Sequence, residues 1–562
     1  TGTKAGDAAE FEGLRSVYAE ADATRTQWCA LGSVKSQIGH TKAAAGAAGL
    51  FKAVMALHHK VLPPTIKVEQ PNPKLGLAQS PFYLNTWARP WIRGSDHPRR
   101  AAVSAFGFGG SNFHVALEEY RGPQRAERLP VHGHELLLLH ASSVAELIQA
   151  TQALIASAEP LPRLAASTRS RFEAGAPQRL ALVAAASEQL GERARAAIAR
   201  LQAQPDKPWH LPDGSAYGCG PAHGGVALLF PGQGSQYLQM GDALAMHLDA
   251  ARAAWDQAAD LSMGEAPLQA VVHPIPAFDE ATLAAQRARL TATEWAQPAL
   301  AAHSAALLAV LRNLNLRADA VAGHSFGELM ALHAAGAVDL PTGLRLARRR
   351  GEAMRDAASA PGAMLALAEP LERVQSLLQA HAPGLVVANH NAPRQLIVSG
   401  ALAEIEALER ALPAQGLRGQ RLAVASAFHS PIVAAASAAF RSALETADVQ
   451  APTVPVYANR DGQRWPTTPA AIRDQLAEQI QQPVQFVAMI EALYADGIRH
   501  FVEVGPGQVL TGLVGAILGE RAHQAIALDR KGGDGLAALL AGLARLAALG
   551  VRFDATRLYG DV

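Results

Sequence analysis

The chain has 562 residues, more than one hydrophobic core usually serves, so we expect about three to four domains. Hydrophobic residues make up 49% of it, charged residues 18%, and the net charge is +1, which is ordinary for a globular protein. The lack of a basic excess argues against nucleic acid or a membrane surface as a main partner. Cys29 and Cys219 are too few for a disulfide framework and lack zinc-site spacing, which favours a reducing cytoplasm. The sequence shows no targeting signal and no apolar run of the roughly 20 residues that span a bilayer.

The first 221 residues divide into two segments. Residues 1–120 end in alternating apolar residues at 101–117, interrupted by glycines, a pattern that predicts two strands joined by a tight turn. Residues 121–221 carry an apolar run at 136–139 and an amphipathic stretch at 187–204, which predict a small α+β adaptor. A run rich in Gly and Pro at 212–221 marks its end.

The third segment, residues 222–528, begins with the short buried-type strand 226–230. Apolar strands then alternate with helical patterns, which predicts an α/β domain with a largely parallel sheet. The last segment, residues 529–562, has leucines at helical spacing over 535–549 and then a stretch at 551–559 that we expect to be an extended strap.

A glycine-flanked loop, FPGQGSQ at 230–236, directly follows the first strand of the third segment. Such a loop exposes its main-chain N–H groups, so it suits binding of a tetrahedral oxyanion together with the N–H of Phe326. In isolation, a Gly-x-Gly pattern is more often a simple strand-ending turn. The functional interpretation therefore depends on the other elements.

The pentapeptide GHSFG at 323–327 lies between an apolar stretch, 318–322, and a helical one, 328–335. This arrangement predicts a sharp strand-to-helix turn with Ser325 at its tip, the geometry called a nucleophile elbow. The helix N-terminus behind Ser325 favours a developing negative charge. Matches to this pattern also arise by chance in long chains rich in Gly and Ala. The motif alone therefore favours a catalytic serine and a simple turn about equally.

A serine nucleophile needs a base at neutral pH, and His429 is one candidate among 20 histidines. It lies in SAFHSP at 426–431, after an apolar stretch. A histidine in such a place is more often a packed or surface residue. The residues alone do not decide between these alternatives.

A series of motifs in order along the third segment resembles the malonyl-CoA:acyl-carrier-protein transacylase family, which includes the acyltransferase domains of polyketide and fatty-acid synthases. The matching stretches are FPGQGSQ (230–236), AQPAL (296–300), GHSFGEL (323–329), RGEAM (350–354), NAPRQLIVSG (391–400), SAFHSP (426–431), PVYANRDG (455–462), QIQQPVQF (479–486) and EVGPGQVLTGL (503–513). The resemblance implies a hydrolase-like α/β core with a parallel sheet and a ferredoxin-like subdomain inserted at about 359–424.

The resemblance implies a catalytic Ser325–His429 dyad in which Gln479, rather than an aspartate, supplies the oxygen that orients the imidazole. His429 would take the serine proton and later activate the incoming thiol. Gln233 and Phe326 would supply the N–H groups of the oxyanion hole.

The same resemblance places the substrate. Arg350 would bind the free carboxylate of a malonyl group through two parallel charge-assisted hydrogen bonds, although a solvated basic helix end is the alternative. Phe428 would lie against the acyl α-carbon and favour malonyl over methylmalonyl, a preference of only about 1–3 kcal/mol. His324 and Asn391 are further candidates for substrate binding. Many malonyl-selective relatives have His where this chain has Ser426, so the selectivity signature is only partly met.

The flanking segments resemble other parts of multidomain synthases. Residues 1–120 resemble the C-terminal part of a β-ketoacyl synthase, a partial thiolase-like segment. The stretches that carry this are TGTKAGDAAE (1–10), SVKSQIGHTKAAAGAAGL (33–50) and SAFGFGGSNFH (104–114). Lys35 and His40 match catalytic positions, but the nucleophilic cysteine and the first histidine are missing, so we expect no condensing activity. Residues 121–221 resemble the linker domain that follows the condensing domain in such synthases. Residues 529–562 resemble the strap that follows the transferase. The stretch 103–120 is most similar to enediyne and polyunsaturated-fatty-acid synthases.

The expected function is transfer of malonyl from coenzyme A to Ser325 and on to the phosphopantetheine thiol of an acyl carrier protein. An α/β-type hydrolase and an inert docking scaffold are the alternatives. The expected partners are malonyl-CoA, an acyl carrier protein domain and the N-terminal half of the β-ketoacyl synthase. The resemblance implies no metal and no permanently bound cofactor, with the coenzyme A thioester acting as substrate.

Overall fold

The computed structural model describes residues 4–22, 24–107, 110–123, 133–357, 362–422 and 427–559. It divides into two compact units, one formed by residues 1–130 and 245–289 and the other by residues 131–244 and 290–562. Residues 245–289, predicted as part of the third segment, therefore pack with the N-terminal segment. Over the described ranges, no helix is both long and apolar enough to cross a membrane.

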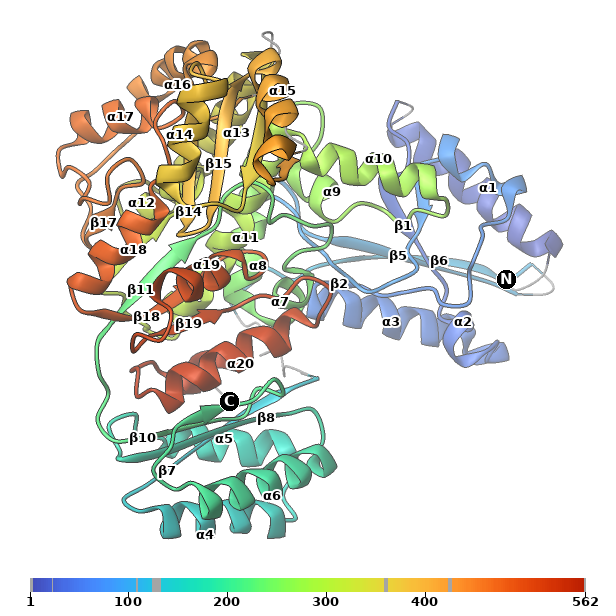
Figure 1. Cartoon of the computed structure of the whole chain (residues 1–562). Helices are drawn as coiled ribbons and strands as arrows, with labels where there is room; N and C mark the ends of the chain where they lie inside the picture. Colours follow the sequence, from blue (N-terminus) through green and yellow to red (C-terminus); the bar gives the residue numbers. More distant parts are fainter. Residues whose placement is uncertain are drawn as a thin grey trace. The chain divides into compact units, whose positions relative to one another are not determined.

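The first unit combines helices with three two-stranded sheets. Strands β5 and β6 pair antiparallel, which confirms the predicted strand–turn–strand at 101–117 (Figure 1). Arg99, almost fully buried, forms ion pairs with Glu119 at 3.1 Å and Asp256 of α8 at 2.7 Å. These pairs hold residues 245–289 to the N-terminal segment within this unit. The elements are α1 (Lys4–Ala21), β1 (Cys29–Leu31), α2 (Lys35–Ile38), α3 (Ala45–His59), β2 (Val61–Leu62), β3 (Phe82–Leu84), β4 (Arg89–Pro90), β5 (Arg100–Phe106), β6 (Asn112–Glu118), α8 (Asp249–Ala259) and α9 (Leu268–Val272).

Within the second unit, residues 135–219 form an antiparallel sheet in the order β7-β8-β10-β9. Its elements are β7 (Glu135–Ala141), α4 (Val144–Ala156), α5 (Leu161–Arg171), β8 (Gln178–Ala184), α6 (Ser187–Ala203), β9 (Trp209–His210) and β10 (Ala216–Cys219). The C-terminal helix α20 (Gly535–Ala548), drawn in red, lies along β8 and β10 on the face opposite α4 and α6 (Figure 1). The helices predicted at 187–204 and 535–549 are confirmed.

The strap predicted as extended at 551–559 is only partly so. Residues Ala555–Tyr559 form a 3₁₀ helix. The side chain of Asp554 causes this turn, because its oxygen accepts hydrogen bonds from the main-chain N–H and the hydroxyl of Thr556.

The central sheet of the second unit has five strands, all parallel, in the order β17-β12-β11-β18-β19. They are β11 (Gly225–Phe230), β12 (Ala320–Gly323), β17 (Val456–Tyr457), β18 (Ile498–Glu503) and β19 (Gln524–Ala527). The sheet confirms the predicted parallel α/β core, and its strands read as continuous apolar runs because helices cover both faces. Phe230 at the end of β11 lies in register with Gly323 at the end of β12, so the FPGQGSQ loop and the Ser325 turn leave the sheet side by side.

Helices surround this sheet, and two more, α7 (Asp242–His247) and α10 (Glu280–Thr291), carry the chain between the units. The surrounding helices are α11 (Thr293–Asn313), α12 (Gly327–Ala334), α13 (Leu340–Asp356), α16 (Ala434–Glu445), α17 (Pro469–Glu478), α18 (Phe486–Ala495) and α19 (Val509–Leu518). Helix α12 confirms the helix predicted at 328–335. Helices α11 and α13 pack closely on each other, and this pair carries the residues around Arg350.

A separate antiparallel sheet, in the order β14-β15-β13-β16, forms between α13 and α16 in the chain. Its elements follow as strand, helix, two strands, helix and strand: β13 (Gly362–Leu367), α14 (Leu371–His381), β14 (Val386–Ala392), β15 (Gln395–Ala401), α15 (Leu402–Ala411) and β16 (Gly419–Arg421). It has a hydrophobic core of its own, from Ala363 to Leu412. Strand β14 carries Asn391 toward the site.

Candidate active site

Ser325 occupies the sharp turn between β12 and α12, with a left-handed backbone at φ 51°. A Cβ atom at Gly323 would lie 2.0 Å from the carbonyl carbon of Gly327, and one at Gly327 would lie 1.9 Å from the Phe230 carbonyl oxygen. Both flanking positions therefore require glycine. The predicted strand-to-helix turn is present, with the strain that this type of turn stores.

The hydroxyl of Ser325 lies 2.7 Å from Nε2 of His429, although the two residues are 104 positions apart. The other ring nitrogen, Nδ1, lies 2.8 Å from the main-chain oxygen of Gln482. Because a carbonyl can only accept, Nδ1 carries the proton and Nε2 is free to accept from Ser325. The structure therefore brings the predicted pair together in the tautomer that general-base chemistry needs.

The oxygen bonded to the imidazole differs from the sequence-based expectation. It belongs to Gln482, whereas the side-chain oxygen of Gln479 accepts a hydrogen bond from Arg350 at 2.8 Å. The side-chain nitrogen of Gln479 donates to the main-chain oxygen of Ser325 at 2.9 Å. The reason is local, because the loop after α17 turns its main chain, not the Gln479 side chain, toward the ring.

Burial lowers the pKa of His429 to about 3, and the positive charge of Arg350 acts in the same direction. The main-chain carbonyls of Gln482 and Gln479 raise the pKa but do not offset the loss of water. The imidazole is therefore neutral over the whole physiological range, as a base must be before it takes a proton.

Helix α13 carries three consecutive arginines, of which only Arg350 is fully buried. Its side chain is buried, with 2% of the residue exposed. Arg348 packs over the ring of Trp295 and pairs with Glu352 at 2.7 Å, and Arg349 is 69% exposed. The solvated helix end that was the alternative therefore describes Arg349 and not Arg350.

The guanidinium of Arg350 is held by neutral groups. One terminal nitrogen donates to the amide oxygen of Gln297 at 3.0 Å and contacts the sulfur of Met354 at 3.2 Å, and the other donates to Gln479. Burial lowers its pKa to about 10, with the nearby Glu328 acting in the opposite direction, so it stays charged at neutral pH. Over the described residues, no carboxylate lies within ion-pair distance of Arg350. Within that part of the chain, the charge of Arg350 is therefore balanced by hydrogen bonds to neutral groups and not by an ion pair.

The FPGQGSQ loop lies against the Ser325 turn. A Cβ at Gly232 would lie 2.7 Å from the main-chain oxygen of His324, so the two segments are in close contact. Among the described residues, none accepts a hydrogen bond from the main-chain N–H of Gln233 or of Phe326, whereas that of Ser325 donates to Asn459 at 2.6 Å. The Gln233 side chain is anchored by a 3.2 Å hydrogen bond to Thr293.

Three further predicted substrate residues lie around the dyad. Nε2 of His324 lies 2.7 Å from the amide oxygen of Asn391, and burial lowers the pKa of His324. Phe428 is buried in the turn directly before His429. Ser426, on which the selectivity signature depends, lies outside the described residues.

Lys35 and His40 lie in the other compact unit. Lys35 begins the short helix α2, and Nδ1 of the exposed His40 accepts a hydrogen bond from the main-chain N–H of Lys42 at 3.1 Å. These contacts join His40 to its own loop and not to Lys35.

Sequence reasoning missed three buried side chains that support the site: Gln297, Asn459 and Glu328. Each lies in one of the quoted motifs, AQPAL, PVYANRDG and GHSFGEL, so position in a motif was the available signal. Burial raises the pKa of Glu328 to about 8. The roles of these residues come only from the contacts of the folded chain.

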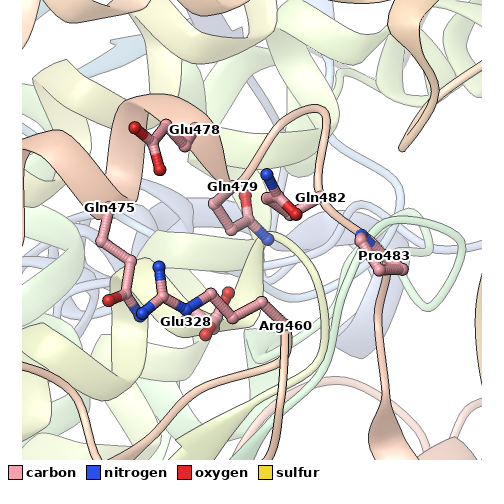
Figure 2. A pocket seen from close by; sticks show the side chains of 7 residues that line it. All are labelled: Glu328, Arg460, Gln475, Glu478, Gln479, Gln482 and Pro483. Carbon is pink, nitrogen blue, oxygen red and sulfur yellow. The ribbon is translucent and has the colours of Figure 1, made fainter.

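A small polar pocket opens beside these residues (Figure 2). It is lined by Glu328, Arg460, Gln475, Glu478, Gln479, Gln482 and Pro483. Most of this lining comes from the end of α17 and the loop that follows it. The loop therefore lines the pocket and also contacts Ser325, Arg350 and His429.

Comparison with known proteins gives matches along most of the chain. Residues 227–546, more than half of it, match the acyl transferase domain family. Residues 1–69 match the C-terminal domain of β-ketoacyl synthases, and residues 71–181 match the ketoacyl-synthetase C-terminal extension.

Curated relatives include a polyunsaturated fatty acid synthase of Thraustochytrium sp., one of whose subunits is 33% identical over 92% of this chain and 20% of its own length. Polyketide synthase GfsA of Streptomyces halstedii is 32% identical over 100% of this chain and 7% of that protein. The chain thus spans no more than a fifth of the length of either relative.

Solved structures agree with these matches. The acyltransferase domain of an iterative polyketide synthase in enediyne biosynthesis is 30% identical, with a TM-score of 0.58, over 76% of this chain and 98% of that one. Malonyl-CoA:acyl carrier protein transacylase of Xanthomonas oryzae is 32% identical, with a TM-score of 0.50, over 55% of this chain and 96% of that one. The chain therefore belongs to the acyl transferase domain family, as a domain of the polyketide-synthase type preceded by the C-terminal and linker segments of a ketoacyl synthase.

Proposed function

We propose that this chain transfers a malonyl group from malonyl-CoA, through an acyl-enzyme on Ser325, to the phosphopantetheine thiol of an acyl carrier protein. The observation that carries the proposal is Arg350, a buried cation held by the amide oxygens of Gln297 and Gln479. A buried guanidinium held by neutral groups favours an anionic ligand, and a carboxylate can bind it through two parallel hydrogen bonds. An ordinary esterase has no use for such a group at the acyl end of its substrate.

In the first half-reaction, Nε2 of His429 takes the hydroxyl proton of Ser325 while the oxygen attacks the thioester carbonyl. The carbonyl oxygen becomes an oxyanion, for which the main-chain N–H groups of Gln233 and Phe326 are the available donors. The imidazolium is stabilised by the Gln482 carbonyl on Nδ1. When the carbon–sulfur bond breaks, His429 returns the proton to the coenzyme A sulfur.

The second half-reaction repeats these steps with a different nucleophile. His429 takes the proton of the phosphopantetheine thiol, the sulfur attacks the malonyl ester, and Ser325 leaves with the proton from the imidazolium. A solved complex of a malonyl-transacylase with a type II polyketide synthase acyl carrier protein, 30% identical to this chain, supports the choice of acceptor. The chemistry that we propose uses no metal and no bound cofactor.

We also propose the finer assignments of fold. The order of strands and helices over 362–421 supports a ferredoxin-like subdomain inserted in a hydrolase-like core. The domain bounds 1–120, 121–221, 222–528 and 529–562 stay predictions, as does the thiolase-like character of the first segment.

The N-terminal half of a β-ketoacyl synthase is the partner that we propose for the first unit. Several large apolar side chains of this unit are exposed, among them Phe51 at 68% and Phe113 at 69%. Exposed apolar side chains of this size are unusual on the solvent-facing surface of a complete domain. They fit a segment that packs against another half-domain. Lys35 and His40 would complete a condensing site only in that assembly.

Selectivity for malonyl depends on Phe428 in this proposal. Phe428 is buried beside His429, where a large side chain would leave little room for an α-methyl group. One methyl group is worth only about 1–3 kcal/mol in an apolar pocket, so we expect a preference rather than exclusion.

The test is incubation with radiolabelled malonyl-CoA followed by mass spectrometry of the intact protein and its peptides. One malonyl group on Ser325, discharged by an added acyl carrier protein, is the expected result. A Ser325→Ala protein that still acquires the label would exclude this nucleophile. Rapid release of free malonate without transfer would favour the hydrolase alternative, and no acylation at all would favour the inert scaffold.

A further inference from the structure

The main chain of Ser325 is held on both sides by side-chain amides. The oxygen of Asn459 accepts the Ser325 N–H at 2.6 Å, and the nitrogen of Gln479 donates to the Ser325 carbonyl at 2.9 Å. The Asn459 nitrogen also donates to the carbonyl oxygen of Gly323. One asparagine thus bridges the last residue of β12 and the tip of the turn.

Asn459 is itself fixed in place. It is 1% exposed and lies two residues after the end of β17. In the sheet, β17 is the neighbour of β12. Its main-chain N–H donates to a carboxyl oxygen of Glu328 at 2.8 Å, and the indole N–H of Trp465 donates to the same oxygen at 3.0 Å. Glu328 is the second residue of α12. Asn459 is therefore hydrogen-bonded both to the turn at Ser325 and to the helix that follows it.

These contacts answer a physical difficulty of the turn. A non-glycine residue with φ 51° is strained, and such a conformation persists only where the surroundings over-determine it. The N–H of Ser325 donates to Asn459, so it does not serve as an oxyanion donor. This hydrogen bond instead fixes the backbone at Ser325. The orientation of the hydroxyl toward His429 follows from that fixed backbone.

We propose that Asn459 is a positioning residue that holds Ser325 in its left-handed conformation, with Glu328 and Trp465 holding Asn459. The inference rests on the proposed role of Ser325 as nucleophile. The hydrogen bonds of Asn459 go to the backbone of the turn and to Glu328, so we expect it to affect the reactivity of the hydroxyl and not substrate affinity.

The test compares Asn459→Ala with Asn85→Ala in the full chain. Asn85 is also a buried asparagine whose nitrogen donates to three main-chain carbonyls, but it lies in the other unit. For Asn459→Ala we expect single-turnover acylation of Ser325 to fall about 100-fold, with KM for malonyl-CoA changed less than about threefold. Labelling of Ser325 by a fluorophosphonate should fall in parallel. Asn85→Ala should lower the melting temperature without this loss of reactivity.

A conservative variant guards against simple misfolding. Asn459→Asp keeps the shape and the oxygen that accepts from Ser325, so it should acylate at least about tenfold faster than the alanine variant. Three outcomes would each overturn the inference. They are equal acylation rates for the two variants, a rise in KM at constant kcat, and equal fluorophosphonate labelling of Asn459→Ala and the parent. Failure of the proposed function is distinguishable, because the parent protein itself would then not be acylated on Ser325.

Discussion

The guanidinium of Arg350 and the hydroxyl-bearing Ser325 are joined through one side chain, since Gln479 accepts from the first at 2.8 Å and donates to the carbonyl of the second at 2.9 Å. The same loop provides the Gln482 carbonyl to His429. A short stretch after α17 therefore contacts Arg350, Ser325 and His429. Changes at any of the three are expected to be felt by the others.

Replacing Arg350 by glutamine should abolish the preference for an acidic acyl group. The variant loses the charge but keeps a polar side chain, so malonyl loading should fall about 100-fold or more, in keeping with two lost charge-assisted hydrogen bonds. Acetyl loading should change far less. Competition between malonyl-CoA and acetyl-CoA, followed by mass spectrometry of the acylated protein, measures the ratio. Arg349→Gln, on the exposed side of the same helix, should leave it unaltered.

The pH dependence of acylation should show a neutral base throughout the physiological range. Because the pKa of His429 is lowered to about 3, kcat/KM for acetyl-CoA should be flat from about pH 5 to 8 and fall only in stronger acid. Arg350 is one cause of the lowering, so Arg350→Gln should move the acid limb to higher pH. An acid limb near the ordinary histidine value of about 6.5 in the parent protein would contradict this interpretation.

Glu328 should make the folded state less stable as pH rises. Burial raises its pKa to about 8, so between its ordinary value and about 8 the folded chain holds a proton that the unfolded chain releases. The contribution is present at low pH and is lost as pH rises through this window. Glu328→Gln cannot ionise and keeps an oxygen for Asn459 and Trp465. Its melting temperature relative to the parent should therefore be higher at pH 9 than at pH 5.

Calorimetry at the two pH values checks this sign, with Glu159→Gln as the control for removal of an exposed carboxylate. A difference in melting temperature that stays constant, or that falls toward pH 9, would mean that Glu328 is ionised when folded at neutral pH.

Gly351 should be needed for α13 to pack closely against α11 and so to place Arg350. A Cβ atom there would lie 2.6 Å from the Cα of Glu294 and 2.6 Å from the oxygen of Thr293, both backbone atoms that cannot give way cheaply. Gly351→Ala should cost roughly 1–3 kcal/mol of stability by overpacking and raise KM for malonyl-CoA. Gly343→Ala is the matched control on the same helix, because its Cβ would meet only a methyl group of Val338 at 3.9 Å. It should be neutral or stabilising in thermal denaturation.

Elements whose signal is local were predictable from the sequence. The turn at Ser325 was predicted because two glycines lie between an apolar strand and a helical stretch, and the parallel sheet because apolar runs such as β11 alternate with helices. The inward-facing Arg350 needed the family resemblance, since three adjacent arginines do not reveal which one a helix buries.

The remaining contacts had no local signal. The oxygen on His429 is a main-chain carbonyl of Gln482, and every residue has a carbonyl, so only the path of the loop selects it. The bridge by Asn459 depends on β17 lying beside β12. The packing of residues 245–289 with the first segment depends on Arg99 and Asp256, which are more than 150 positions apart.

The backbone conformation at Ser325 also limits which nucleophile the scaffold accepts. With φ at 51°, a second substituent on Cβ would crowd the main chain, so β-branched residues are strongly disfavoured. Threonine, a secondary alcohol branched at Cβ, is thereby disfavoured, whereas cysteine, like serine, has a single substituent on Cβ. A redesign with cysteine at this position, which would form thioester intermediates, is therefore compatible with the turn. A redesign with threonine is not.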